Sequence, residues 1–135
     1  MNKIIKRSFL LLASGLILIS SCKKKEECNE AGTGGSVVVK ANIKHHSTPI
    51  NGATVYVKYN TQEFPGNNTA AYDATFNGDL NSNIVVLSGL KCGDYYIYAE
   101  GYDQIIDTTV VGGVPFSTDQ KEGEISILVP VTEGD

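Results

Sequence analysis

The chain has 135 residues and a formal net charge of -4, and 41% of its residues are hydrophobic. This length fits one domain of ordinary size better than two. A mildly acidic chain does not have the broad basic surface that nucleic-acid binding requires, so we expect no nucleic-acid partner.

The first residues predict a leader that is removed after export. Lys3, Lys6 and Arg7 form a basic start, and an apolar stretch follows at residues 9–19. At about 1.5 Å per residue, such a helix is too short to cross a hydrocarbon core about 30 Å thick. A basic segment followed by a short apolar run is typical of a signal peptide rather than a transmembrane anchor. We therefore interpret residues 1–21 as a signal peptide, whose removal takes away the only arginine of the chain.

The end of this leader resembles a bacterial lipoprotein box. Ile19-Ser20-Ser21-Cys22 places an aliphatic residue and two small residues before a cysteine. The resemblance implies that Cys22 becomes the new N-terminus and carries a diacylglyceryl group, with palmitate as a typical acyl chain. Each buried CH₂ contributes about 0.8 kcal/mol, so two or three acyl chains would hold the protein durably on a membrane.

The next residues connect this anchor to the rest of the chain. Residues 23–27, Lys-Lys-Lys-Glu-Glu, resemble the signal that sends lipoproteins of Bacteroidota to the cell surface. The resemblance implies an outer-membrane, lipid-anchored and surface-exposed protein, whereas the charges alone indicate only a solvated segment. Residues 22–35 are charged and then small, which predicts a flexible, lipidated tether. The folded domain is then expected to cover residues 36–135.

Beyond the tether, short strands alternate with turns. Residues 37–43 are rich in β-branched side chains, and residues 53–59 alternate apolar and polar side chains, as a half-buried strand does. Further strands are expected at residues 70–76, 84–87, 95–100, 105–111 and 124–131. The loop between the last two contains Gly and Pro, and no stretch keeps a helical stripe. About seven short strands in about 100 residues predict an antiparallel β-sandwich.

Two stretches resemble transthyretin-like and carboxypeptidase-regulatory-like domains. Residues 38–57 contain a strand, the turn Pro49-Ile50-Asn51-Gly52-Ala53 and an alternating Val strand, and residues 87–102 contain Gly-x-Tyr-x-Ile-x-Ala-x-Gly-Tyr after a Leu-rich segment. The resemblance implies an all-β, seven-stranded antiparallel Greek-key sandwich of the prealbumin-like type, with another Ig-like sandwich as the alternative. It implies no activity by itself. The chain also ends without the Tyr-Arg-Gly-Ser sequence of the relatives that hydrolyse 5-hydroxyisourate.

Cys28 and Cys92 remain as a pair once Cys22 carries lipid. In an oxidising compartment an even number of cysteines favours a disulfide, and two free thiols are the alternative. The resemblance places the starts of strands 36–43 and 95–101 at one pole of the domain, where both cysteines lie. We therefore expect a disulfide between Cys28 and Cys92.

The remaining polar residues predict no catalytic, cofactor or metal site. No Ser/His/Asp or paired-carboxylate arrangement is visible, and no basic partner that would activate either cysteine of the pair as a nucleophile is visible. His45-His46 would point to opposite faces of a strand, and no further ligands stand at a suitable spacing. The oxygen-rich stretch at residues 73–83 does not have EF-hand spacing and is typical of turns. We therefore expect a protein that is not an enzyme.

Tyrosines provide the candidate binding surface. Strand alternation points Tyr95 inward and Tyr96, Tyr98 and Tyr102 outward, and the resemblance places outward-facing Tyr56 on the adjacent strand. Exposed rings stack on sugars and anchor protein interfaces, although tyrosines also stabilise sheets by cross-strand pairing alone. We expect a non-catalytic binding or adhesion module for a glycan or an envelope protein. The alternative is a structural accessory subunit of an envelope complex with no ligand of its own.

Overall fold

The computed structural model describes Cys28 and residues 30–134. The predicted signal peptide at residues 1–21 and the predicted lipidation residue Cys22 lie outside this part. Within it, none of the helical segments is long and apolar enough to cross a membrane.

The described residues form an all-β structure with one short 3₁₀ segment, η1 (Thr69–Ala71). The strands are β1 (Thr33–His45), β2 (Thr48–Pro49), β3 (Thr54–Tyr59), β4 (Ala74–Asn77), β5 (Ile84–Leu90), β6 (Gly93–Asp103), β7 (Thr108–Thr118) and β8 (Glu122–Glu133). Eight strands are therefore present in this part of the chain, rather than the seven expected. The additional strand is β2, a two-residue segment that closes a hairpin onto the end of β1.

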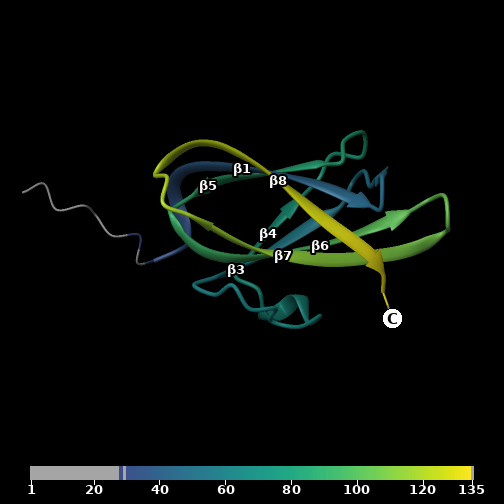
Figure 1. Ribbon diagram of the computed structural model, residues 1–135, viewed down its shortest axis with the longest axis horizontal. Coiled ribbons are helices and arrows are strands. Elements are labelled where there is room, and N and C mark those ends of the chain that lie inside the picture. The colour runs from purple at the N-terminus through teal and green to yellow at the C-terminus, as the bar shows by residue number, and fades with distance from the viewer. Residues whose placement is uncertain (1–27, 29, 135) are drawn as a thin grey trace, which may run out of the picture.

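The strands form one curled sheet (Figure 1). Its order is β2-β1-β8-β7-β6-β3-β4, and β5 also pairs with β1. The sheet is mixed, which corrects the purely antiparallel arrangement that we expected: β1 and β8 are parallel from Ser36 beside Glu122 to His45 beside Val131. The turns after β6 and after β7 each reverse the chain, so β8 runs in the direction of β6. Because β1 also runs in that direction, β8 joins it in parallel.

The glycines and the proline of β7 correct a second expectation. Residues 112–115 were predicted to lie in a loop, but they continue β7. A Cβ at Gly112 would overlap the carbonyl oxygen of Pro130, so glycine lets β7 and β8 approach each other. β7 pairs with β8 only at Val110 and Val111. Pro115 lies farther along β7, on the part of the strand that does not pair with β8, and a proline without an N–H donor is tolerated at such an edge.

The predicted strand at 105–111 also begins later than expected. Residues 104–107 form the turn between β6 and β7, and Asp107 has a left-handed φ of 57°. A polar residue with a short side chain tolerates that conformation in a tight turn. Apolar Ile105 and Ile106 therefore lie at the tip of a hairpin and not in a strand.

The core is built from alternate residues of the long strands. Val37, Val39, Ala41 and Ile43 of β1 are fully buried, and so are the corresponding residues of β3 and β6. The period-two pattern therefore identified the buried face correctly. Tyr95 points into this core, as predicted, and its hydroxyl group donates a hydrogen bond to the Lys91 carbonyl oxygen at 2.6 Å.

The folded domain begins before residue 36. Ala31 is buried, and its backbone N–H donates to Asn60 Oδ1 at 2.9 Å, while the N–H of Gly32 donates to the hydroxyl of Tyr95 at 2.9 Å. Strand β1 then starts at Thr33. The small residues that indicated a tether instead pack closely, because a Cβ on Gly93 would lie 3.0 Å from the backbone of Ala31. The tether predicted at 22–35 is therefore too long at its C-terminal end.

Candidate functional site

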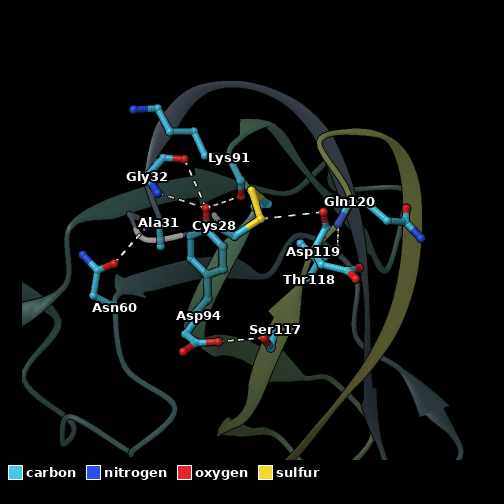
Figure 2. The surroundings of a disulfide bond; sticks show 12 residues. Cys28, Ala31, Gly32, Asn60, Lys91, Asp94, Ser117, Thr118, Asp119 and Gln120 are labelled. Carbon is cyan, nitrogen blue, oxygen red and sulfur yellow. Dashed lines mark hydrogen bonds between the residues drawn. A yellow bond between two sulfur atoms is a disulfide. The ribbon is translucent and has the colours of Figure 1, made fainter. Parts of the chain in front are cut away.

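Cys28 and Cys92 lie at disulfide distance, as predicted, with their Cα atoms 5.2 Å apart. Figure 2 shows this bond beside the turn that contains Asp119, whose carbonyl oxygen lies 3.7 Å from Cys28 Sγ. Cys28 precedes β1, Cys92 precedes β6 and Asp119 lies between β7 and β8. The disulfide thus joins the N-terminal segment to one end of the molecule, which we call the N-terminal pole (Cys28 and residues 30–32, 91–92 and 119–121).

The structure brings together three of the four tyrosines of the predicted patch. Tyr56 on β3 and Tyr98 on β6 are direct cross-strand partners, with ring centroids 6.3 Å apart, and Tyr96 lies on the same face of β6. Tyr102 is separate from them. It lies near the end of β6, is 48% exposed, and bonds through its hydroxyl to the carboxylate of Asp107. Tyr102 therefore does not belong to this patch.

Tyr98 is also not exposed, which corrects a further expectation. Only 3% of Tyr98 is accessible, because the segment between β3 and β4 folds over this face. That segment contributes Tyr72, whose ring stacks on Tyr98 at 5.6 Å, and Phe64, whose ring lies 5.8 Å from Tyr98. Burial raises the pKa of Tyr72 to about 12 and also raises the pKa of Tyr98. Two aromatic residues in an otherwise polar loop were the sequence signal for this contact.

The covering segment is held in a defined conformation. The hydroxyl of Tyr72 donates to the Gly66 carbonyl oxygen at 2.9 Å, and Asn68 Oδ1 accepts from the N–H of Ala70 at the start of η1. The N–H of Asp73 donates to the Val57 carbonyl oxygen at 2.9 Å. These bonds order residues 66–73 and tie the end of the segment to β3.

The exposed part of this aromatic cluster is a shelf formed by Phe64, Tyr96, Gly113 and Pro115, which we call the aromatic shelf. Phe64 is 51% exposed, and its ring centroid lies 5.5 Å from that of Tyr96. Tyr96 lies across Gly113, where a Cβ would come within 2.7 Å of the ring. Pro115 is exposed and is the cross-strand partner of Tyr96. A largely apolar surface with two tilted rings therefore faces solvent.

Polar side chains lie at one end of this shelf. Asp94 is exposed and precedes Tyr96 by two positions on β6, so both point to the same face. Its Oδ1 accepts hydrogen bonds from Ser117 Oγ at 2.6 Å and from Gln62 Nε2 at 3.2 Å. Figure 2 shows the bond between Asp94 and Ser117. We refer to Gln62, Asp94 and Ser117 as the polar trio.

A pocket lies at the end of the molecule opposite the disulfide. Its volume is about 600 Å³, and its lining includes Ile50, Leu80, Tyr102 and Ile105. Ile50 follows β2, Leu80 follows β4, and Tyr102 and Ile105 lie at the end of β6 and in the turn after it. Figure 1 shows the ends of these strands at the far end from β1's start. We call this end the distal pole (residues 46–53, 78–83, 102–107 and 133).

A buried histidine supports the distal pole. His45 is 4% exposed, its Nδ1 lies 2.7 Å from Asp103 Oδ2, and its Nε2 lies 3.3 Å from Glu133 Oε2. The hydrogen bond to Asp103 raises the pKa of His45, against the opposing effect of burial, and the same bond lowers the pKa of Asp103. Because carboxylates face both ring nitrogens, this arrangement positions the histidine rather than freeing it as a general base. No sequence pattern indicated this pairing, because Asp103 lies 58 positions from His45 along the chain.

Comparisons with protein-family models, with curated proteins and with solved structures found no match to this chain. The site is therefore interpreted from its own residues. The aromatic shelf offers ring faces for stacking, and the polar trio offers hydrogen-bond donors and acceptors beside them. Such a combination binds polar ligands that also have an apolar face.

Proposed function

We propose that this protein is a non-catalytic glycan-binding module. It would be anchored by lipid at Cys22 in the outer membrane and exposed at the cell surface, after removal of the signal peptide at residues 1–21. The proposal of a lipid anchor is based on the lipoprotein box at residues 19–22. The proposal of a cell-surface location is based on the Lys-Lys-Lys-Glu-Glu segment at residues 23–27. The glycan-binding role rests on one structural observation: the half-exposed ring of Phe64 beside Tyr96, next to the polar trio.

We also propose that the curled sheet is a prealbumin-like Greek-key sandwich. Two groups of strand pairings support this proposal: β1 pairs with β2, β5 and β8, whereas β6 pairs with β3 and β7. Buried residues from both groups share one core. In this arrangement the aromatic shelf lies on the outer face of the second group.

The chemistry of the shelf fits a sugar ring. A pyranose has a face of C–H groups that packs on aromatic rings and an edge of hydroxyl groups that forms hydrogen bonds. Phe64 and Tyr96 would contact the C–H face, and Asp94 with its two partners would contact the hydroxyl edge. Gly113 has no side chain that would push the Tyr96 ring away from the sheet, so this ring lies across β7 beside Phe64. The part of the chain after the leader has no arginine, which disfavours bidentate recognition of carboxylate or phosphate groups.

A glycan array tests this proposal. We expect the wild-type protein to bind a defined set of glycans and the Phe64→Ala variant to lose about tenfold in affinity, equivalent to about 1.4 kcal/mol. Tyr102→Ala is the matched control, because Tyr102 is a similarly exposed aromatic residue at the other pole, and it should bind like the wild type. Circular dichroism checks that both variants are folded.

Two outcomes of the array would contradict the proposal. Equal loss of binding in the Phe64→Ala and Tyr102→Ala variants would show that the glycan does not bind at the aromatic shelf. Negligible binding by the wild type would favour a structural accessory subunit with no ligand of its own.

A further inference from the structure

We propose that the distal pole is a second binding site, which docks a partner protein through an aliphatic side chain flanked by Lys or Arg. This site is independent of the aromatic shelf, because its residues lie at the other end of β6 and in the turns after β1 and β4. The argument begins with the apolar side chains that surround its pocket. Leu80 is 83% exposed and Ile105 is 78% exposed, and both line the pocket together with half-exposed Tyr102. Ile106, beside Ile105, is 44% exposed.

These apolar side chains lie on turns and not on a flat strand surface. An isolated exposed aliphatic residue needs no explanation, but several around one pocket form an apolar patch of the kind that marks an interaction site. The tip of the β6–β7 hairpin carries two of them in succession. Turns of this kind usually carry polar residues.

The turns are held in place before any partner binds. Asp103 Oδ1 accepts from the N–H of Ile105 at 2.8 Å, while its Oδ2 is held by His45. In the other turn, the carbonyl oxygen of Asp79 accepts from the N–H of Gly52 at 3.0 Å. Gly52 also leaves room for Leu80, because a Cβ there would lie 3.1 Å from the Leu80 Cδ2 atom. A preformed pocket loses little conformational entropy when a partner binds.

Charge at the distal pole defines the partner further. Asp79 precedes Leu80, Asp107 bonds to the hydroxyl of Tyr102, and Glu133 faces His45. None of the described residues that line the pocket is Lys or Arg. Asp103, Gln104, Thr48 and Asn51 also line the pocket, beside its apolar side chains. Carboxylates around apolar side chains favour a ligand with an apolar centre and positive charges on either side.

The same charges disfavour two other occupants. A second copy of this chain would bring the same carboxylates against each other. An anionic lipid surface would be repelled in the same way. A glycan fits less well for a different reason, because it would leave the aliphatic side chains of Leu80 and Ile105 without an apolar partner. A protein segment with a Leu- or Ile-like side chain between basic residues meets all of these conditions.

Peptide binding to the full-length protein in detergent micelles tests this proposal. The probes are a short peptide with central leucines flanked by lysines, the same peptide with glutamates in place of the lysines, and the same peptide with alanines in place of the leucines. Fluorescence anisotropy at low ionic strength gives the dissociation constants. We expect the first peptide to bind at least about tenfold more tightly than either of the others, and added salt to weaken its binding.

Substitutions locate the bound peptide. Ile105→Asn should weaken the binding of the Leu–Lys peptide by about tenfold. Leu128→Asn is the matched control and should leave binding unchanged, because Leu128 is an aliphatic residue of β8 that is 55% exposed and does not line the pocket. Both side chains are largely exposed, so neither change should unfold the domain, and circular dichroism checks this.

Several outcomes would overturn the proposal. Equal binding of the Glu peptide would refute the role of charge, and equal binding of the Ala peptide would refute the role of the pocket. Absence of binding by all three peptides, or equal effects of the two substitutions, would refute the site itself. If the protein self-associates and Ile105→Asn abolishes this, the occupant of the site is a second copy of the chain and not a partner protein. If the protein binds lipid vesicles and Ile105→Asn abolishes this, the occupant is a membrane. None of these outcomes bears on glycan binding at the shelf.

Discussion

Removal of the disulfide should destabilise the protein by a predictable amount. Cys28 and Cys92 are separated by 64 positions in the sequence. For a loop of this length, the loss of unfolded-chain entropy on cross-linking stabilises the folded state by about 4 kcal/mol. Cys28 lies outside the strands, so its replacement leaves the core contacts of β1 and β6 in place. Most of the effect should therefore arise in the unfolded chain.

The assay is equilibrium unfolding in urea of the double variant Cys28→Ser/Cys92→Ser and of the oxidised wild type. We expect the free energy of unfolding to fall by about 4 kcal/mol, which moves the urea midpoint down by about 2 M for a slope of about 2 kcal/mol per molar. The reduced wild type is the control and should match the variant, because both lack the cross-link. Hydrogen exchange should also become faster at Ala31 and Gly32, which the disulfide holds near Tyr95.

A loss of less than about 1 kcal/mol would refute this reasoning. It would mean either that the bond does not form or that the unfolded chain is already compact without it. If the protein is stable under oxidising conditions and still has two reactive thiols, the disulfide does not form. Thiol labelling under denaturing conditions measures this directly.

Three further changes test other parts of the structure. Gly112→Ala should lower the free energy of unfolding in urea by about 1–3 kcal/mol, because the new Cβ would overlap the backbone of β8; unchanged stability would contradict this. Tyr98→Ala should cost about 3–5 kcal/mol and speed hydrogen exchange in residues 61–73, whereas unchanged exchange there would show that the segment does not rest on this ring. NMR titration should give His45 a pKa above 6.5 and a lower one in Asp103→Asn. Because the folded pKa is raised, the contribution of His45 to stability is present below about pH 6.5 and is lost as the pH rises through the folded value. A pKa that is the same in both proteins would refute the pairing.

The inward face of the strands could be predicted from sequence because it depends on local alternation. Val37 and Val39 occupy alternate positions of β1, and Tyr95 and Ile97 occupy alternate positions of β6. A strand turns alternate side chains to the same face. The pairing of Cys28 with Cys92 was predicted from the even number of cysteines left after lipidation and from the resemblance, which places the starts of two strands at one pole. The parallel pairing of β1 with β8 depends on where the chain travels after each turn, which no short sequence pattern contains.

The errors at the candidate site have a tertiary cause. Strand alternation gave the correct face for Tyr98, but alternation does not show that Phe64 and Tyr72 return to cover it. Glycine also had two meanings in this sequence. Asn51-Gly52 marks a turn, as expected, whereas Gly113 lies within a strand and makes room for Tyr96. Propensity alone favours a turn at both positions.

The position of a bound oligosaccharide tests the central proposal most directly. Amide and side-chain NMR signals of the labelled protein can be followed during titration with a glycan that the array identifies. We predict that the shifted signals belong to residues 62–66, 94–98 and 113–117, which form the aromatic shelf and the polar trio. Signals that shift around Tyr102, on the outer face of β5, or nowhere at saturating glycan would contradict the proposed function.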